Sequence, residues 1–372
     1  MINEQRLVDQ FISYVKISSP TKKEGRFAAH LCKELEALGL EVSIDDAGEK
    51  VGSDTGNVIA RLKGNTPGET ILFSSHMDTV SPSIDVKPEI RDGVIYSDGT
   101  TVLGGDDKAG IAAIMEALKT IIEGDLPHAD IEVVFSIFEE GGLHGAKNLD
   151  MSLLKAKQVF VLDSGGDPGQ IIIKGPAQDK LEFLVHGRPA HAGVAPEDGI
   201  SAIMVASHAI SQMKLLRIDA ETTANIGKIE GGSVTNIVPP ETMVVAEARS
   251  LNNDKLKVQS EHMVKCFEDA AEKFGATVDS KVTRMYSAFD VEADSDIVTK
   301  AITACETIGL KAFTAPSGGG SDTNIFNARG IMAINLGIGE KKPHTLEEHL
   351  HIKDLVASSK LVLELVKLSV EI

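Results

Sequence analysis

The chain has 372 residues, which is more than a single hydrophobic core usually serves, so two domains are expected. Hydrophobic residues make up 42% and charged residues 25%, the composition of an ordinary globular protein. The formal net charge of −18 would repel phosphate backbones and anionic lipids. Nucleic acids and membrane surfaces are therefore excluded as expected partners, and a peptide or a small metabolite fits better.

The cysteines and the N-terminal segment predict the cellular compartment. Cys32, Cys266 and Cys305 lie far apart without C-x-x-C spacing, which indicates reduced thiols and a cytoplasmic location. The opening segment MINEQRLVDQFISYVK lacks a basic start followed by an apolar core, so no signal peptide is expected. No stretch reaches the roughly 18 apolar residues of a membrane span.

Strands and helices alternate in the first part of the chain. Residues 20–39 predict a surface helix, with Thr21 as a candidate N-cap and Gly39 as its stop. Residues 108–124 predict a second, more apolar helix that ends at Gly124. Four short, almost continuously apolar segments are typical of strands buried on both faces: TILFSS, IEVVFSIF, QVFVLD and IMAINLGI. This alternation predicts an α/β fold whose mostly parallel sheet is covered on both faces.

The pattern changes after about residue 178. The following segments predict the order β-α-β-β-α-β: strand 180–187, helix 199–213, strand 222–231, strand 241–250, helix 254–274 and strand 276–286. This is the order of the ferredoxin-like split βαβ unit. Because the first pattern resumes near residue 290, we expect one domain from residues 1–178 and 290–372, with residues 179–289 inserted as an α+β domain.

Ionisable side chains stand where the predicted parallel strands end, which is where ligands bind in such sheets. In chain order they are His76, Asp78, Asp106, Glu139, Glu140, Asp163 and His344. Two carboxylates ~5 Å apart repel by roughly 3 kcal/mol at an effective dielectric constant of ~20, so the group needs protons or a cation. Imidazole with carboxylate suits Zn²⁺, and this number of donors suits two ions that share one carboxylate.

Six segments, in this order, resemble the M20 family of di-zinc peptidases, and most closely its peptidase T (tripeptidase) branch: SSHMDT, GGDDKAG, EEGG, LDSGG, GRPAHAGVAPEDGISAI and HTLEEH. The resemblance covers nearly the whole chain. It implies a zinc-exopeptidase-like catalytic domain and an inserted lid and dimerisation domain. It also implies two Zn²⁺ per subunit, held by His76, Asp106, Glu140, Asp163 and His344, with Asp106 as the bridge. Co²⁺ or Mn²⁺ would accept the same ligands.

The resemblance further implies roles in catalysis. A hydroxide that bridges the two zinc ions would attack the peptide carbonyl, with Glu139 as the general base. Asp78 would accept the second ring N–H of His76. The peptide bond between Asp106 and Asp107 would be cis.

The inserted domain would contribute three further side chains. His191 would stabilise the oxyanion, in this family from the other subunit of a homodimer. Asn236 and Arg249 would bind the substrate, and Arg249 could hold a terminal carboxylate.

Simpler readings of these residues remain open. Asp106 could be only a helix cap, and Asp322 is expected to brace the SGGGSD turn outside the site. The segment EEGGLHG departs from the tripeptidase branch, in which a bulkier residue often follows the paired glutamates.

The expected function is removal of the N-terminal residue from short peptides, mainly tripeptides. Two alternatives are kept. One is an amidohydrolase of the same fold that acts on N-acyl amino acids or dipeptides, and the other is a metal- or partner-binding protein without catalysis.

Overall fold

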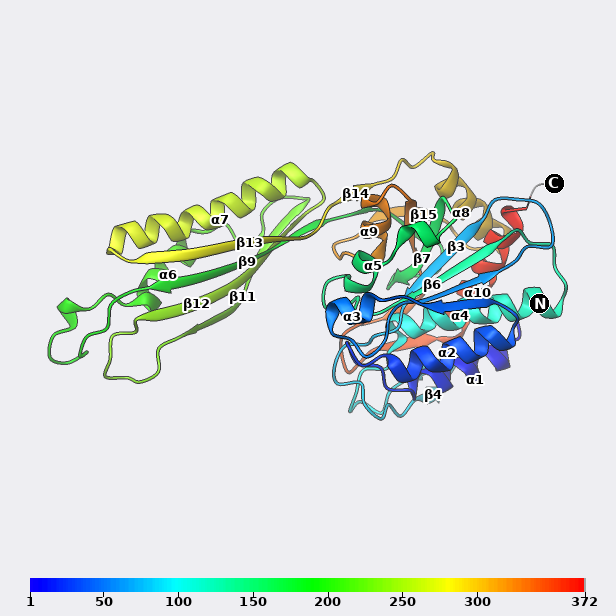
Figure 1. Ribbon diagram of the computed structural model, residues 1–372, viewed down its shortest axis with the longest axis horizontal. Helices are drawn as coiled ribbons and strands as arrows, with labels where there is room; N and C mark the ends of the chain where they lie inside the picture. The colour runs from blue at the N-terminus through cyan, green and yellow to red at the C-terminus, as the bar shows by residue number, and fades with distance from the viewer. Residues whose placement is uncertain (371–372) are drawn as a thin grey trace. The chain divides into compact units, whose positions relative to one another are not determined.

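The computed structural model describes residues 1–370, which form two units (Figure 1). Unit 1 comprises Met1–Ile173, Asp290–Ser317 and the described residues 321–370. Unit 2 comprises Lys174–Phe289 together with Gly318–Gly320. None of the helices in the described part of the chain combines the length and apolar character that a membrane crossing requires.

Unit 1 is built on a nine-stranded sheet. Along its main path the strands are β1 (Glu41–Ile44), β2 (Val58–Leu62), β6 (Ile131–Ser136), β3 (Ile71–His76), β7 (Gln158–Ser164), β16 (Met332–Gly337), β8 (Gln170–Gly175) and β14 (Phe289–Asp290), and β15 (Phe313–Pro316) pairs with β8. The central strands β6, β3, β7 and β16 are parallel, whereas β2 and β8 join them antiparallel. The four apolar segments of the sequence are these four parallel strands, so the expected α/β fold is confirmed.

Helices cover both faces of this sheet, which is why every residue of β3 and β6 is buried. The helices of unit 1 are α1 (Glu4–Val15), α2 (Gly25–Ala37), α3 (Ala47–Val51), α4 (Gly105–Glu123), α5 (His144–Asn148), α8 (Asp296–Thr307), α9 (Asp322–Ala328) and α10 (Ile352–Leu368). Helix α4 packs on β3 and β7, with α1 and α10 against it. On the opposite face, Phe326 of α9 joins Leu72 and Val134 in one apolar cluster.

Helix α2 starts later than the sequence pattern suggested. Glu24 occupies the N-cap position, and Thr21 lies in the preceding loop, so the prediction of Thr21 as the cap was wrong. The Thr21 hydroxyl instead donates to the Asp78 carboxylate at 2.9 Å. The expected stop was correct, because the chain turns at Gly39 with φ +85°.

Unit 1 also has a small antiparallel sheet. Its strands are β17 (Glu340–Lys341), β18 (His349–His351), β5 (Val94–Tyr96) and β4 (Glu89–Arg91). Strand β18 directly precedes α10. The segment HTLEEH connects β17 to β18 and is therefore anchored at both ends.

Unit 2 has an antiparallel sheet in the order β10 (Leu216–Arg217), β11 (Thr222–Gly231), β12 (Glu241–Ser250), β9 (Ala177–His186) and β13 (Thr277–Tyr286). Helices α6 (Ala202–Gln212) and α7 (Asn253–Phe274) pack on it, and Phe183 and Phe267 stack in the core between them. Burial alternates along all of β9, which is typical of a strand with one covered face. The order confirms the ferredoxin-like arrangement expected from the sequence.

Candidate metal centre

The carboxyl ends of the parallel strands in unit 1 bring together the acidic side chains and imidazoles that the sequence singled out. His76 is the last residue of β3, Glu139 and Glu140 follow β6, and Asp163 lies near the end of β7. Asp106 stands at the start of α4, whose first turn reaches the same edge of the sheet. Residues that are far apart in the sequence therefore meet in one place, as expected of a parallel sheet.

His76 is only 2% exposed, and both of its ring nitrogens have partners. Its Nε2 lies 2.9 Å from Asp106 Oδ1 and 3.7 Å from Asp163 Oδ1. Its Nδ1 lies 2.8 Å from the backbone carbonyl of Asp78. Because a carbonyl oxygen can only accept, Nδ1 carries the proton in the neutral ring, which leaves the Nε2 lone pair available to a cation.

The Asp78 side chain has a wider set of partners than expected. Its Oδ1 is 3.5 Å from His76 Nδ1, so the shorter contact of the ring is with the Asp78 carbonyl and not with the carboxylate. The carboxylate accepts the backbone N–H of Glu139 at 2.9 Å and that of Glu140 at 3.3 Å. Asp78 thus supports both His76 and the loop that carries the two glutamates.

Asp106 lies between the two imidazoles. Its Oδ1 faces His76, and its Oδ2 lies 3.1 Å from Nε2 of His344. The same His344 nitrogen is 3.0 Å from Glu140 Oε1. Asp106 thus offers one carboxylate oxygen to each of the two histidines, which is the position expected of a side chain shared by two cations.

Donor atoms gather closely enough to hold metal. Those of His76, Asp106 and Glu140 all lie within 4.8 Å of one another, and so do those of His76, Asp107 and Asp163. In residues 1–370 no other group of three or more His, Cys, Asp or Glu donors meets this criterion. The peptide bond between Asp106 and Asp107 is cis, as expected.

Three acidic residues that the sequence did not assign also belong to this region. Asp107 is fully buried and accepts the His76 backbone N–H at 3.1 Å. Asp322, expected to lie outside the site, is 2% exposed and accepts the Ser136 hydroxyl at the end of β6 at 2.5 Å. Asp322 therefore lies near other carboxylates of the site, which corrects that expectation. The cap of α9 is Ser321 and not Asp322.

Glu348, the third of these residues, accepts the backbone N–H groups of Gly104 and Asp106 at 3.0 and 3.1 Å. It therefore fixes the chain at the residue that bridges the two imidazoles. Its only signal in the sequence was its place in HTLEEH, four residues after His344.

Without a cation, the carboxylates of the site outnumber its two imidazoles. Burial, together with neighbouring carboxylates, raises the pKa of Asp107, Glu139 and Asp163 well above the usual range. Hydrogen bonds to Asp106 and Glu140 raise the pKa of His344 to about 10. Bound divalent cations would neutralise the buried carboxylates in place of protons, so these side chains fit a metal pair in number, type and position.

The three predicted residues of the inserted region lie in unit 2. His191 is exposed, and the next residue, Ala192, donates its N–H to the carbonyl of Asn236 at 3.0 Å, so these two segments are adjacent. Arg249 makes two 3.1 Å hydrogen bonds to the Glu247 carboxylate on the same strand.

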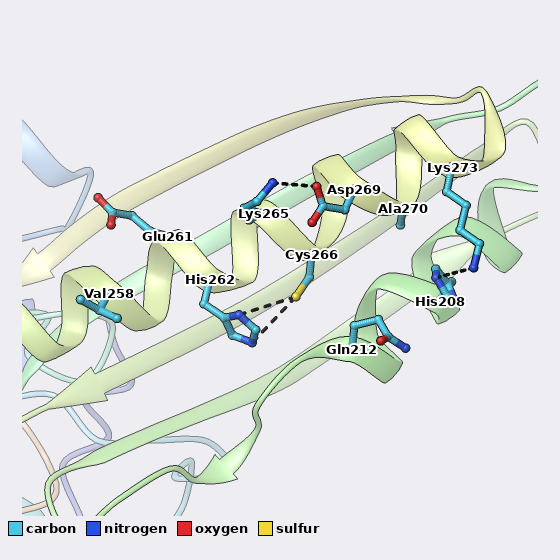
Figure 2. A pocket seen from close by; sticks show the side chains of 10 residues that line it. All are labelled: His208, Gln212, Val258, Glu261, His262, Lys265, Cys266, Asp269, Ala270 and Lys273. Carbon is cyan, nitrogen blue, oxygen red and sulfur yellow. Dashed lines mark hydrogen bonds and ion pairs between the residues drawn. The ribbon is translucent and has the colours of Figure 1, made fainter.

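Unit 2 also has a hollow of about 650 Å³ between α6 and α7 (Figure 2). Cys266 and His262 face each other there on successive turns of α7, with Sγ 3.8 Å from Nε2, and His208 lies opposite on α6 beside Lys273. These side chains do not form a cluster of three donors.

Comparison with known proteins supports the same interpretation. Residues 72–368 match the family model described as peptidase family M20/M25/M40. Peptidase T of Desulfitobacterium hafniense is 28% identical over 382 residues, covering 100% of this chain and 92% of that protein.

Two solved structures are more similar in sequence. A tripeptidase from Staphylococcus aureus is 41% identical with a TM-score of 0.96, covering 99% of both chains. The aminopeptidase PepT from Bacillus cereus is 43% identical with a TM-score of 0.90, covering 98% of both chains.

Proposed function

The chain belongs to peptidase family M20/M25/M40, in its peptidase T-like branch, and on that premise we propose that it is an exopeptidase releasing the N-terminal residue of short peptides, mainly tripeptides. The observation that carries the proposal is the position of Asp106, which offers one oxygen to His76 and the other to His344. The similar proteins include a tripeptidase and an aminopeptidase, which supports the choice of substrate.

Five side chains would hold two divalent cations per subunit. His76 and Asp163 would bind one ion, Glu140 and His344 the other, and Asp106 both. Zn²⁺ suits this set best, and Co²⁺ or Mn²⁺ would also be accepted. When bound, such ions lower the pKa of water and polarise a carbonyl group. Asp107 offers a further carboxylate beside His76 and Asp163.

Glu139 is the proposed general base. It is not one of the five proposed ligands, it is 8% exposed, and the Asp78 carboxylate accepts its backbone N–H at 2.9 Å. A carboxylate oxygen of Glu139 would take the proton of the attacking water and pass it to the leaving nitrogen, which needs a group free of metal beside the reacting atoms.

The inserted unit is proposed to complete the site as a lid and dimerisation domain. His191 would donate to the developing oxyanion from the partner subunit of a homodimer, and Asn236 and Arg249 would bind the peptide. Two N–H groups of Arg249 are engaged with Glu247, and this ion pair would hold the guanidinium ready for a substrate carboxylate.

The proposed location is the cytoplasm. All three cysteines are free, and the acidic surface expected from a net charge of −18 speaks against nucleic acids and anionic membranes as partners.

Substrate profiling of the purified, zinc-loaded protein tests the proposal. We expect release of the first residue from a tripeptide, little turnover of the N-acetylated tripeptide or the matching dipeptide, and loss of activity after chelation. Preference for the acetylated peptide would identify an amidohydrolase instead. If none of the three peptides is hydrolysed, the remaining hypothesis is a metal- or partner-binding protein without catalysis.

A further inference from the structure

Two loops of unit 1 meet next to Glu139 and Glu140. One is the connection between α1 and α2, residues 16–24, and the other follows β6 and carries Phe138, Glu139 and Glu140. The first loop also runs beside the residues after β3: Ser19 donates its hydroxyl to the Met77 carbonyl at 2.8 Å, and Thr79 donates its N–H to the Ser19 carbonyl at 3.0 Å.

Two buried carboxylates take up three successive backbone N–H groups of the second loop. Glu24 Oε1 accepts that of Phe138 at 3.0 Å, and Asp78 accepts those of Glu139 and Glu140. Glu24 and Asp78 are both 0% exposed. Burying the Glu24 carboxylate beside an already acidic site costs free energy. The hydrogen bonds that Glu24 accepts, including the one from Phe138, offset this cost.

Phe138 needs such support, because its φ of +47° is a conformation that a residue with a bulky side chain rarely adopts. Glu24 Oε1 also accepts the N–H of Lys22, and its Oε2 accepts the Ser53 hydroxyl at 2.7 Å. The carboxylate is thereby held from three sides and has a fixed position from which to hold Phe138.

We propose that Glu24, assisted by Thr21, is a positioning residue that fixes the Phe138–Glu140 loop and so aims the general base Glu139. Thr21 acts through Asp78, whose Oδ2 accepts the Thr21 hydroxyl at 2.9 Å. This inference rests on the proposed function for its kinetic consequence, but the hydrogen bonds themselves can be tested without activity.

Glutamine is the informative replacement for Glu24. Its amide oxygen can still accept the Phe138 and Lys22 N–H groups, and the Ser53 hydroxyl can rotate to accept from the amide nitrogen. Glu24→Gln therefore preserves the positioning, whereas Glu24→Ala removes it. Thr21→Ser and Thr21→Val form a second, milder pair, in which only valine loses the hydroxyl.

Glu132 supplies a matched control. It is 1% exposed, lies on β6 near the opposite end of the strand, and accepts the backbone N–H groups of Lys155 and Ala156 at 2.9 and 3.0 Å. Glu132→Ala thus removes a buried carboxylate with a similar structural role away from the site, and it measures what general destabilisation does to activity.

The experiment combines tripeptide kinetics at saturating zinc with hydrogen exchange of the full-length, metal-free protein. For Glu24→Ala we expect kcat to fall about 10- to 100-fold with KM changed less than about threefold, and faster exchange in the peptide that contains residues 138–140. Glu24→Gln should stay within about threefold of wild type in kcat and exchange normally. Thr21→Val should show a smaller loss that Thr21→Ser restores, and Glu132→Ala should lower Tm without lowering kcat.

Three results would overturn the inference: wild-type kcat and exchange in Glu24→Ala, equal kinetic loss in Glu24→Gln and Glu24→Ala, or an equal loss in Glu132→Ala. If wild-type protein hydrolyses no peptide, the proposed function fails instead. The exchange measurement then still decides whether Glu24 holds the loop.

Discussion

At the scale of single residues, Glu139 is the side chain on which the proposed chemistry depends most. Replacement by glutamine keeps its shape and removes its basicity, so we expect kcat to fall by about 10²–10⁴-fold, the usual contribution of a general base. Zinc affinity should be unchanged, because Glu139 is not one of the five side chains proposed to hold the ions. Steady-state kinetics and zinc titration check this, and activity above one tenth of wild type would rule out the role.

Gly141, the residue after the paired glutamates, has no room for a side chain. A Cβ added there would lie 1.7 Å from Cε2 of Phe138, whose ring covers the glycine and stacks on His144. The Phe138 ring thus occupies the space that a side chain at position 141 would need.

Gly141→Ala should accordingly destabilise unit 1 by roughly 1–3 kcal/mol, because one of the two groups must move. Adding Phe138→Ala should recover part of the loss, so that the two changes are not additive. Chemical denaturation of the two single variants and the double variant measures the coupling. Additive effects would show that the ring and the added methyl group do not compete for space.

At the scale of elements, Asp179 ties together three parts of unit 2. It is 3% exposed on β9 and accepts the Ser260 hydroxyl of α7 at 2.7 Å and Arg284 Nε of β13 at 2.5 Å. Asp179→Ala leaves both donors without this acceptor and should cost roughly 2–4 kcal/mol.

Exchange rates along β9, α7 and β13 would report that loss. Asp279→Ala, on the exposed face of β13, is the control and should change little, since the Asp279 side chain is 82% exposed. Equal effects of the two substitutions would argue against a special role for Asp179.

The sequence was sufficient to place the four parallel strands of unit 1 and the main elements of unit 2, because apolar runs and helical periodicity are local signals. The four parallel strands and helices α4, α6 and α7 lie where these patterns put them. The start of α2 was misplaced because Thr21 looks like a cap but is used by a distant partner, Asp78. Contacts between distant parts of the chain also explain why three acidic residues were missed: Asp107, Asp322 and Glu348. Only long-range packing buries them and brings them beside the other carboxylates.

At the scale of the whole molecule, the proposed metal site belongs to unit 1 alone. Ligands that bind only the folded state stabilise it by about 4 kcal/mol at a thousandfold excess over Kd. Zinc should therefore slow hydrogen exchange in the peptides of unit 1 and leave those of β9–β13 nearly unchanged. Equal protection of both units would contradict a site built by unit 1 alone.

The central claim is that a pair of divalent cations holds the buried carboxylates and imidazoles together, and counting bound metal tests it most directly. Elemental analysis of the wild-type protein after zinc loading and dialysis should give about two ions per chain. The Asp106→Asn variant should hold markedly less, because this side chain faces both His76 and His344. Wild-type protein that retains no zinc, or an Asp106→Asn variant that retains as much as wild type, would contradict the account.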